Sequence, residues 1–317
     1  MLGKEMSNPR NAYGETLIEL GKIYPNLVVL DADLSKSTKT IMFAKKYPER
    51  FFEMGIAEAN MISTAAGLAS CGKIPFVSTF AVFATGRVYD QIRMDIAYSD
   101  ANVKIFATHG GISVGKDGSS HQMIEDLALM RVLPNMKIFA PSDSQQTKEI
   151  VKLMALNKGP MYARVGRADA TTIYKKEDLK DIKIGKGITL KDGNDASIIA
   201  CGTMVDYALE ARKILLNEGI KIRVVDMHTI KPIDVKLVKS CAKETNLIIT
   251  AEEHSIIGGL GSAVSEIIAE NRLNIRFKRI GVEDTFCESG KPDDLMEKYG
   301  LNEKHLANTI KNLLSQL

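Results

Sequence analysis

Short apolar runs alternate with helix-like segments along most of the chain. Residues 26–33 read NLVVLDAD, an apolar run that ends in acids, and residues 37–47 after it have the spacing of a helix. Further strand-like runs, rich in β-branched and aromatic residues, lie at 50–54, 74–80, 103–109, 136–141, 161–166, 196–202, 221–227, 247–253 and 275–282. Such runs, each followed by a helical pattern, predict βαβ units. The expected fold is α/β, with mainly parallel sheets flanked by helices.

The alternation lapses once, over residues 168–195, which are polar and rich in lysine. We interpret this passage as a linker that has room for an edge strand or two. It divides the chain into a first α/β domain at residues 1–167 and a second at residues 196–317. The length of 317 residues suits two domains, because most domains hold roughly 100–200 residues.

Composition and charge argue against several classes of protein. The net charge of +3 is spread along the chain, without the block of lysine and arginine typical of proteins that bind nucleic acids or membrane surfaces. No apolar run approaches the roughly 18 residues of a membrane span, and the N-terminus lacks the apolar core of a signal peptide. Four cysteines without C-x-x-C spacing are expected to be reduced and buried. We therefore expect a cytoplasmic protein.

Polar residues gather where the strands of the first domain are predicted to end. Ligands of open parallel sheets bind at this carboxyl edge. One segment there is a long, glycine-rich loop, HGGISVGKDGSSHQ at residues 109–122, which can approach a ligand closely. The candidates are Asp31 and Asp33, Glu58, His109, Asp117 and His121 within or at the start of that loop, and Arg164 and Arg167 at the last strand.

Taken alone, most of these residues have an ordinary structural explanation. Acids such as Glu58 and Asp33 commonly cap helices, and arginines are usually surface charges. Phe80 and Phe83 of STFAVF would by default belong to the core. Two histidines and an aspartate in one glycine-rich loop are harder to explain in this way, because imidazoles suit proton transfer near neutral pH. Together the residues indicate a site with an acid, proton-transferring groups and an anion anchor.

A second glycine-rich stretch, EEHSIIGGLGSA at residues 252–263, lies between a predicted strand and a predicted helix. It lacks the third glycine of the nucleotide-binding pattern G-x-G-x-x-G. We therefore interpret it as a tight strand-to-helix turn.

These motifs resemble, in order and over nearly the whole chain, the C-terminal half of transketolase, a thiamine-diphosphate enzyme. The matching stretches are LDADLSKST, RFFEMGIAEANM, PFVSTFAVF, YDQIRM, THGGISVGKDGSSHQMIEDLALMR, PSD, RVGR, IKPID, EEH with GGLGSAVSE, and SGKPDDLMEKYGL. The resemblance implies a pyrimidine-binding domain followed by a transketolase C-terminal domain. It also implies transfer of a two-carbon ketol unit between phosphorylated ketose and aldose sugars, as in the pentose phosphate pathway.

The resemblance assigns one group of residues to the cofactor. In this family the glutamate at the position of Glu58 hydrogen-bonds N1′ of the aminopyrimidine, which helps the cofactor's 4′-amino group to remove the proton from C2 of the thiazolium. Phe80 and Phe83 would flank the pyrimidine ring, and Asp33 matches a position near the cofactor at the subunit interface. The small residues after Glu58 would let their helix pack tightly beneath the cofactor.

A second group is assigned to the sugar. His109 and His121 would face the substrate channel, where they exchange protons and bind hydroxyl groups, and Asp117 would hold a sugar hydroxyl. Arg167, together with Arg164, would bind the phosphate, since a planar guanidinium suits a bidentate anion contact.

The sequence departs from full-length transketolases in one respect. Those enzymes carry an N-terminal domain whose Gly-Asp-Gly motif binds Mg²⁺ and the diphosphate, whereas this chain has only Lys-Asp-Gly, at 116–118 and 191–193. We therefore expect no metal ligands here and a separate N-terminal subunit that supplies them. Because the family's sites form across a dimer, the expected assembly is a heterotetramer with two copies of each chain. The chain alone would be an inactive self-dimer.

Three alternatives stay open at this point. The matching half of 1-deoxyxylulose-5-phosphate synthase has a glutamate in a similar GIAE context, although STFAVF and THGGISVGKDG are closer to transketolase. The β subunit of a 2-oxo acid dehydrogenase shares the architecture and chain length. A non-catalytic binding or regulatory homologue is the third, although a scaffold alone would not need this set of polar residues.

Overall fold

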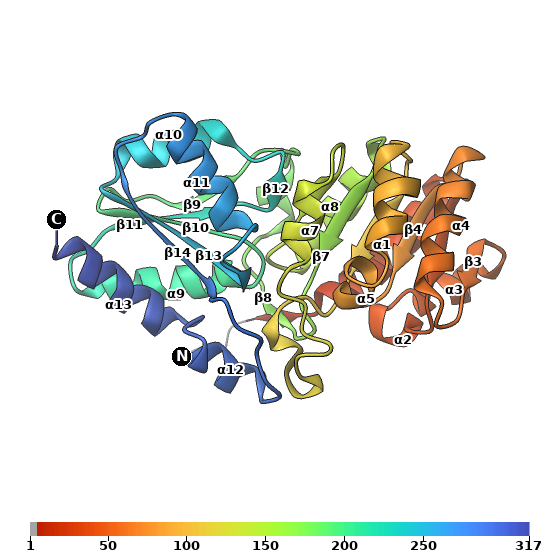
Figure 1. The fold of residues 1–317 in the computed structure, drawn as a ribbon, viewed down its shortest axis with the longest axis horizontal. Helices are drawn as coiled ribbons and strands as arrows, with labels where there is room; N and C mark the ends of the chain where they lie inside the picture. The colour runs from red at the N-terminus through yellow and green to blue at the C-terminus, as the bar shows by residue number, and fades with distance from the viewer. Residues whose placement is uncertain (1–4, 317) are drawn as a thin grey trace.

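Two α/β units lie side by side in the computed structural model, which describes residues 5–316 (Figure 1). Six strands of the first half and one strand of the second half form a seven-stranded sheet in the order β12-β6-β7-β5-β4-β2-β3. The second half also forms a five-stranded sheet in the order β14-β13-β10-β11-β9. In these two sheets all neighbouring strands are parallel except at one edge of each sheet. There β12 pairs antiparallel with β6, and β9 pairs antiparallel with β11. The predicted α/β fold of mainly parallel sheets is confirmed.

The strands of the first sheet are β2 (Leu27–Asp31), β3 (Phe51–Glu53), β4 (Ile74–Ser78), β5 (Lys104–Ala107), β6 (Lys137–Phe139), β7 (Met161–Arg164) and β12 (Thr229–Lys231). Its helical segments are α1 (Pro9–Ile23), α2 (Ser35–Thr38), α3 (Ile41–Lys46), η1 (Pro48–Arg50), α4 (Glu58–Ser70), α5 (Ala81–Thr85), α6 (Tyr89–Gln91), the π-helix η2 (Ile92–Tyr98), η3 (Ile112–Asp117), α7 (Asp126–Val132) and α8 (Ser144–Leu156). Every residue of β2, β5 and β7 is buried. Apart from Asp31, Lys104 and Arg164 at their ends, these strands consist of apolar and aromatic residues, as strands covered on both faces require.

The second half contains the strands β9 (Ile188–Lys191), β10 (Ala196–Ala200), β11 (Ile222–Asp226), β13 (Leu247–Ser255) and β14 (Arg276–Val282). Its helices are α9 (Met204–Asn217), α10 (Val235–Glu244), α11 (Leu260–Glu270), α12 (Pro292–Lys298) and α13 (Glu303–Leu314). The position of one strand was not predicted. β12 belongs to the second half of the sequence but extends the first sheet. The two halves therefore share a sheet edge.

The passage at residues 168–195 is tied to both halves. It carries β8 (Ala170–Thr171), the short 3₁₀ helix η4 (Lys176–Leu179) and the edge strand β9. β8 pairs with β1 (Met6–Ser7). Asp143, which caps α8, also accepts hydrogen bonds from Ile173 and Tyr174 N–H, and the Tyr174 hydroxyl donates to the buried Asp226 at 2.7 Å. Burial raises the pKa of Asp226 to about 6. We keep this passage as the proposed boundary between the two domains.

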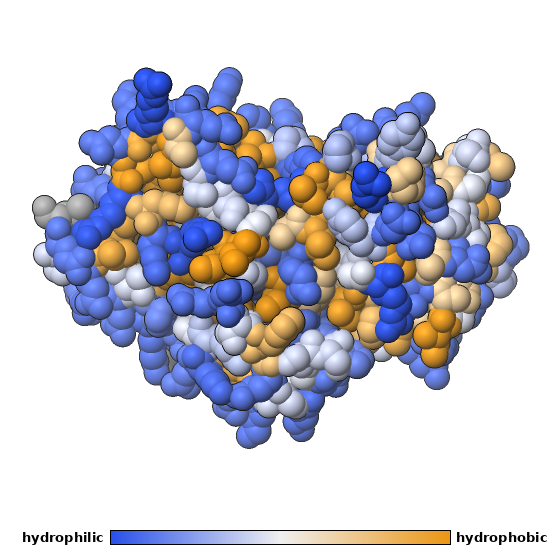
Figure 2. Space-filling model, viewed as in Figure 1, coloured by the Kyte–Doolittle hydropathy of each residue, from blue (hydrophilic) through white to orange (hydrophobic). Residues whose placement is uncertain are grey.

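The small residues of α4 are divided between the interior and the surface. Met61, Ile62 and Ala65 are buried, but Ala59 and Gly67 are exposed. The small side chains therefore leave one face of α4 open. On the side of the molecule drawn in Figure 2, the hydrophobic surface is divided into separate patches among hydrophilic side chains.

The cysteines follow the expectation with one exception. All four are free thiols, and Cys201, Cys241 and Cys287 are buried, whereas Cys71 is exposed. Among the described residues, no helix combines the length and the apolar character needed to cross a bilayer.

Candidate active site

The candidate residues follow strands that end at one edge of the first sheet. β2, β4, β5 and β7 run parallel, so their carboxyl ends lie side by side. Phe80 follows β4, His109 follows β5 and Arg167 follows β7. The topology thus brings together side chains that are far apart in the sequence, as predicted for an open parallel sheet.

Glu58 begins α4, and its side chain is 5% exposed. Nη1 of Arg87 donates to Glu58 Oε1 at 2.7 Å. Arg87, which the sequence reasoning did not select, also lies over the ring of Phe83, with its guanidinium carbon 4.2 Å from the ring centroid. The acid is therefore buried and is connected to the Phe83 ring through Arg87, its only hydrogen-bonding side chain among the described residues, which is half-exposed.

The aromatic residues form one cluster beside this acid. The rings of Phe80 and Phe83 are nearly parallel, with centroids 6.0 Å apart. His109 stacks on Phe80 at 3.8 Å, and His121 meets Phe83 edge-on at 5.4 Å. A carboxylate next to stacked rings fits the edge and the faces of an aminopyrimidine, which offers ring nitrogens and a π-surface. The residues present therefore fit the pyrimidine end of thiamine diphosphate.

His109 is buried, and its backbone is in the left-handed region at φ 60°. Its Nδ1 lies 2.9 Å from the Thr108 hydroxyl. Burial first, and then the charges of Arg10, Arg167 and His121, lower the pKa of His109 to about 3. The imidazole is therefore neutral near pH 7, a state that suits hydrogen bonding to a hydroxyl group.

The lowered pKa of His109 predicts a loss of stability in acid. The unfolded chain binds a proton below a pKa of about 6.5, but the folded chain does so only near 3, so this contribution is complete above pH 6.5 and is lost as the pH falls toward 3. We expect His109→Asn to remove about 2–3 kcal/mol of the difference in unfolding free energy between pH 7 and pH 4.5. Asparagine is chosen because it tolerates φ near +60°.

Urea unfolding at the two pH values measures this effect, with the exposed His305→Asn as the matched variant. An equal pH dependence in wild type and His109→Asn would contradict the assignment.

Two arginines, Arg167 and Arg10, are candidates for the anion anchor expected from the sequence. Arg167 is 45% exposed, donates to the Val114 carbonyl at 2.8 Å, and lies 3.5 Å from the carboxylate of Asp117. Arg10 is the second, because its charge acts on both Arg167 and His109. Its Nη1 donates to the Ser37 carbonyl at 3.1 Å, while its buried Nε finds no hydrogen-bond partner within the described part of the chain.

Arg10 was not selected from the sequence, although a signal was present. It lies in the first turn of α1, directly after Pro9. A cation there is unfavourable, since the N-terminus of a helix carries partial positive charge. A basic residue at such a position therefore indicates another role, which for Arg10 is its position near Arg167 and His109.

Arg164 does not fit the phosphate role expected for it. Its side chain is 8% exposed, and Nη1 donates to the fully buried Asp126 at 2.7 Å. Nη2 donates to the Glu253 carbonyl at 2.6 Å. All of these contacts face the interior, so we assign Arg164 to the structure between the two halves and not to the substrate.

The second half of the chain supports the loop that carries Asp117. Glu253 Oε1 accepts from Ser113 N–H at 2.6 Å, and its Oε2 accepts from the Thr203 hydroxyl at 2.7 Å. A side chain at Gly111, where φ is 84°, would collide with Glu253. The loop also packs against α12, near the lower centre of Figure 1, where Ser289 donates to the Lys116 carbonyl at 2.5 Å. The C-terminal half therefore fixes the shape of this loop.

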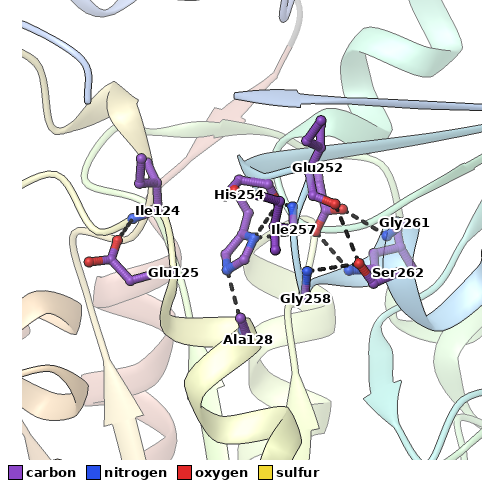
Figure 3. A network of polar contacts seen from close by, with 12 residues as sticks. Ile124, Glu125, Ala128, Glu252, His254, Ile257, Gly258, Gly261 and Ser262 are labelled. Carbon is purple, nitrogen blue, oxygen red and sulfur yellow. Dashed lines mark hydrogen bonds and ion pairs between the residues drawn. The ribbon is translucent and has the colours of Figure 1, made fainter. Parts of the chain in front are cut away.

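The second glycine-rich stretch holds its own anion. Glu252 accepts from Leu260 and Gly261 N–H, both at 2.7 Å, at the N-terminus of α11 (Figure 3). A side chain at Gly259 would run into the Glu252 carboxylate. His254 Nε2 accepts from Ala128 N–H of the first half at 3.3 Å. The stretch therefore fits a tight turn that joins the two halves. Glu252 occupies the N-terminus of α11, where a nucleotide-binding loop would hold a phosphate.

Two further observations complete the site. Asp33 is exposed, with φ of 62° and its N–H bonded to Glu53 at 2.7 Å, so its carboxylate lies at the surface near the end of β2. Over residues 5–316, no three His, Cys, Asp or Glu side chains are grouped so that they could hold a metal ion.

Comparisons with known proteins match both halves. Residues 5–171 match the model of the transketolase pyrimidine binding domain, and residues 185–306 match that of the transketolase C-terminal domain. A protein of Methanocaldococcus jannaschii whose name designates a transketolase C-terminal section is 54% identical over 95% of this chain and 94% of its own. An apulose-4-phosphate transketolase subunit of Phocaeicola vulgatus is 39% identical over 95% of both chains.

A solved structure extends this match to three dimensions. It is described as a split gene transketolase, inactive beta4 tetramer, and is 52% identical, with a TM-score of 0.90 over 97% of this chain and 98% of its own. The chain therefore belongs to the transketolase family and corresponds to the C-terminal section that is a separate polypeptide in split-gene transketolases.

Proposed function

We propose that this chain is the C-terminal subunit of a two-subunit transketolase, which binds the pyrimidine end of thiamine diphosphate. The observation that carries the proposal is the buried carboxylate of Glu58, which Arg87 connects to the Phe83 ring of the stacked Phe80–Phe83 pair. A separate N-terminal subunit would bind the diphosphate and Mg²⁺ through a Gly-Asp-Gly motif. Among residues 5–316 of this chain, no three His, Cys, Asp or Glu side chains are grouped so that they could hold the metal ion.

Each side chain has a definite part in this proposal. The bound cofactor supplies a thiazolium carbon that carries the two-carbon unit. Glu58 shares a proton with N1′ of the pyrimidine ring, and Phe80 and Phe83 contact the ring faces. Asp33 lies at the edge of the cofactor site, where the partner subunit closes it.

The sugar is held by the groups on the loop and on α1. His109, which is neutral, hydrogen-bonds a substrate hydroxyl, and His121 exchanges protons with the reacting oxygen. Asp117 accepts a hydrogen bond from a sugar hydroxyl. Arg167 and Arg10 bind the phosphate, because their two positive charges act on each other and one N–H of Arg10 has no partner among residues 5–316.

The assembly that we propose is a heterotetramer with two copies of each subunit. The solved neighbour, described as a split gene transketolase in an inactive beta4 tetramer, supports this, because its beta chains without a second kind of chain are described as inactive. The exposed face of α4 next to Glu58 offers a surface for the partner. We place the complex in the cytoplasm, where four free thiols are stable.

Arg167→Ala tests the phosphate role. In the reconstituted complex we expect the KM for phosphorylated sugars to rise about tenfold to a hundredfold, the equivalent of one or two charge-assisted hydrogen bonds. The kcat should change little, because the contact is made equally in the ground state and the transition state.

Steady-state kinetics with a phosphorylated ketose and with the same ketose without phosphate give the comparison. Arg93→Ala, an exposed arginine on η2, serves as the matched variant. A fall in kcat with an unchanged KM would mean that Arg167 does not anchor the phosphate.

A further inference from the structure

Arg87 contacts both of the groups that the proposed function gives to the pyrimidine ring. Its Nη1 donates to Glu58 Oε1 at 2.7 Å, and its guanidinium carbon lies 4.2 Å above the Phe83 ring centroid. A guanidinium is planar and presents N–H donors along its edge. It therefore takes the same edge-and-face position, with the acid at its edge and the aromatic ring at its face, that a heteroaromatic ring would take between these two side chains.

The local chain makes this contact reversible. Arg87 lies between α5 and α6, directly after the exposed Gly86 and before the fully buried Val88. Val88 fixes the backbone, while the Arg87 side chain itself is 48% exposed. Because solvent already reaches the guanidinium, the side chain can turn outward without repacking the core.

The contact also has a reason to exist before a ligand binds. A buried carboxylate without a partner is costly, and Arg87 is the only side chain among the described residues that hydrogen-bonds Glu58. The arginine therefore stabilises the carboxylate in the chain as it stands. It does so by occupying the atoms that a ring nitrogen would need.

We infer that Arg87 is a placeholder for the cofactor's pyrimidine ring. Arg87 occupies the position between Glu58 and Phe83 that the ring would take, and the ring displaces Arg87 on binding. This inference rests on the proposed function, because it takes Glu58 and Phe83 to be the pyrimidine site. Binding then requires the fraction of molecules in which Arg87 has turned out, and the apparent dissociation constant is raised in proportion. If Arg87 is in place about 90% of the time, its removal tightens binding about tenfold.

Calorimetric titration of thiamine diphosphate into the reconstituted two-subunit complex, at a fixed and saturating Mg²⁺ concentration, tests the inference. We expect Arg87→Ala to lower the Kd about tenfold. Arg87→Lys should fall between this variant and wild type, since an ammonium can pair with Glu58 but has no plane to lie on the ring. Arg93→Ala, which removes an exposed arginine that contacts Met94, should leave the Kd unchanged.

Glu58→Ala separates the two levels of the proposal. If Glu58→Ala weakens binding while Arg87→Ala leaves it unchanged or weakens it, the pyrimidine site stands and the placeholder inference is overturned. If Glu58→Ala leaves the Kd unchanged, the proposed pyrimidine site fails, and the inference about Arg87 fails with it.

Discussion

Replacing Glu58 with alanine in the reconstituted complex is expected to lower kcat about 10²- to 10⁴-fold, which is close to abolishing turnover. The carboxyl group is buried and bound to Arg87, which lies over the Phe83 ring, and alanine can neither accept nor donate the shared proton. The fold should survive, because the Arg87 side chain left behind is half-exposed and can be hydrated.

Two variants make this result specific. Glu58→Gln keeps the shape and a hydrogen-bonding amide but cannot exchange a proton, so we expect nearly the same loss of kcat. Glu49→Ala removes an acid that is 67% exposed and paired with the adjacent Arg50, and it should retain wild-type rates. Thermal unfolding confirms that each variant is folded. Wild-type turnover in Glu58→Ala would remove Glu58 from the chemistry.

The second large effect concerns stability. Arg164→Met is expected to lower the unfolding free energy of the chain by about 3–5 kcal/mol, because it leaves Asp126 charged and buried without its partner. The variant also loses the hydrogen bond to the Glu253 carbonyl, which joins the two halves of the chain.

Arg167→Met is the matched variant for this measurement. It lies three residues further along the chain, is 45% exposed, and should cost less than about 1 kcal/mol in urea unfolding. The double variant Asp126→Asn, Arg164→Met should lose less than the sum of the two single changes, since the buried charge is removed with its partner. Equal losses for Arg164→Met and Arg167→Met would restore Arg164 as a surface, substrate-facing residue.

The predicted fold followed from patterns that depend on local sequence. Leu27–Asp31 of the run NLVVLDAD form β2, and its first four residues are apolar, as expected for a strand covered on both faces. The grouping of Phe80 and His109 could be predicted for a related reason, since strands of a parallel sheet end at the same edge. The notion of an acid, histidines and an anion anchor at that edge needed no tertiary detail.

The parts that escaped prediction depend on partners distant in the sequence. Arg164 and Arg167 have the same residue type and lie three residues apart. Contacts with Asp126 on α7 and with the Glu253 carbonyl hold Arg164 in the interior. β12 is three residues long, and nothing in its sequence says that it joins the sheet of the other half.

The small residues of α4 show a different limit. They were expected to let the helix pack tightly beneath the cofactor, and in this chain Ala59 and Gly67 are exposed. A run of small side chains permits close approach, yet the sequence does not say whether the approaching surface belongs to the same chain. In the proposed assembly that surface is supplied by a second polypeptide.

Ketol transfer from xylulose 5-phosphate to ribose 5-phosphate, with thiamine diphosphate and Mg²⁺ present, tests the central claim most directly. The chain is assayed alone and then mixed with the Gly-Asp-Gly subunit. Activity in the mixture and none in the chain alone is the predicted result. Activity of the chain alone would contradict the division of the cofactor site between two subunits. An inactive mixture that instead consumes pyruvate and glyceraldehyde 3-phosphate would contradict the transketolase assignment and favour the synthase.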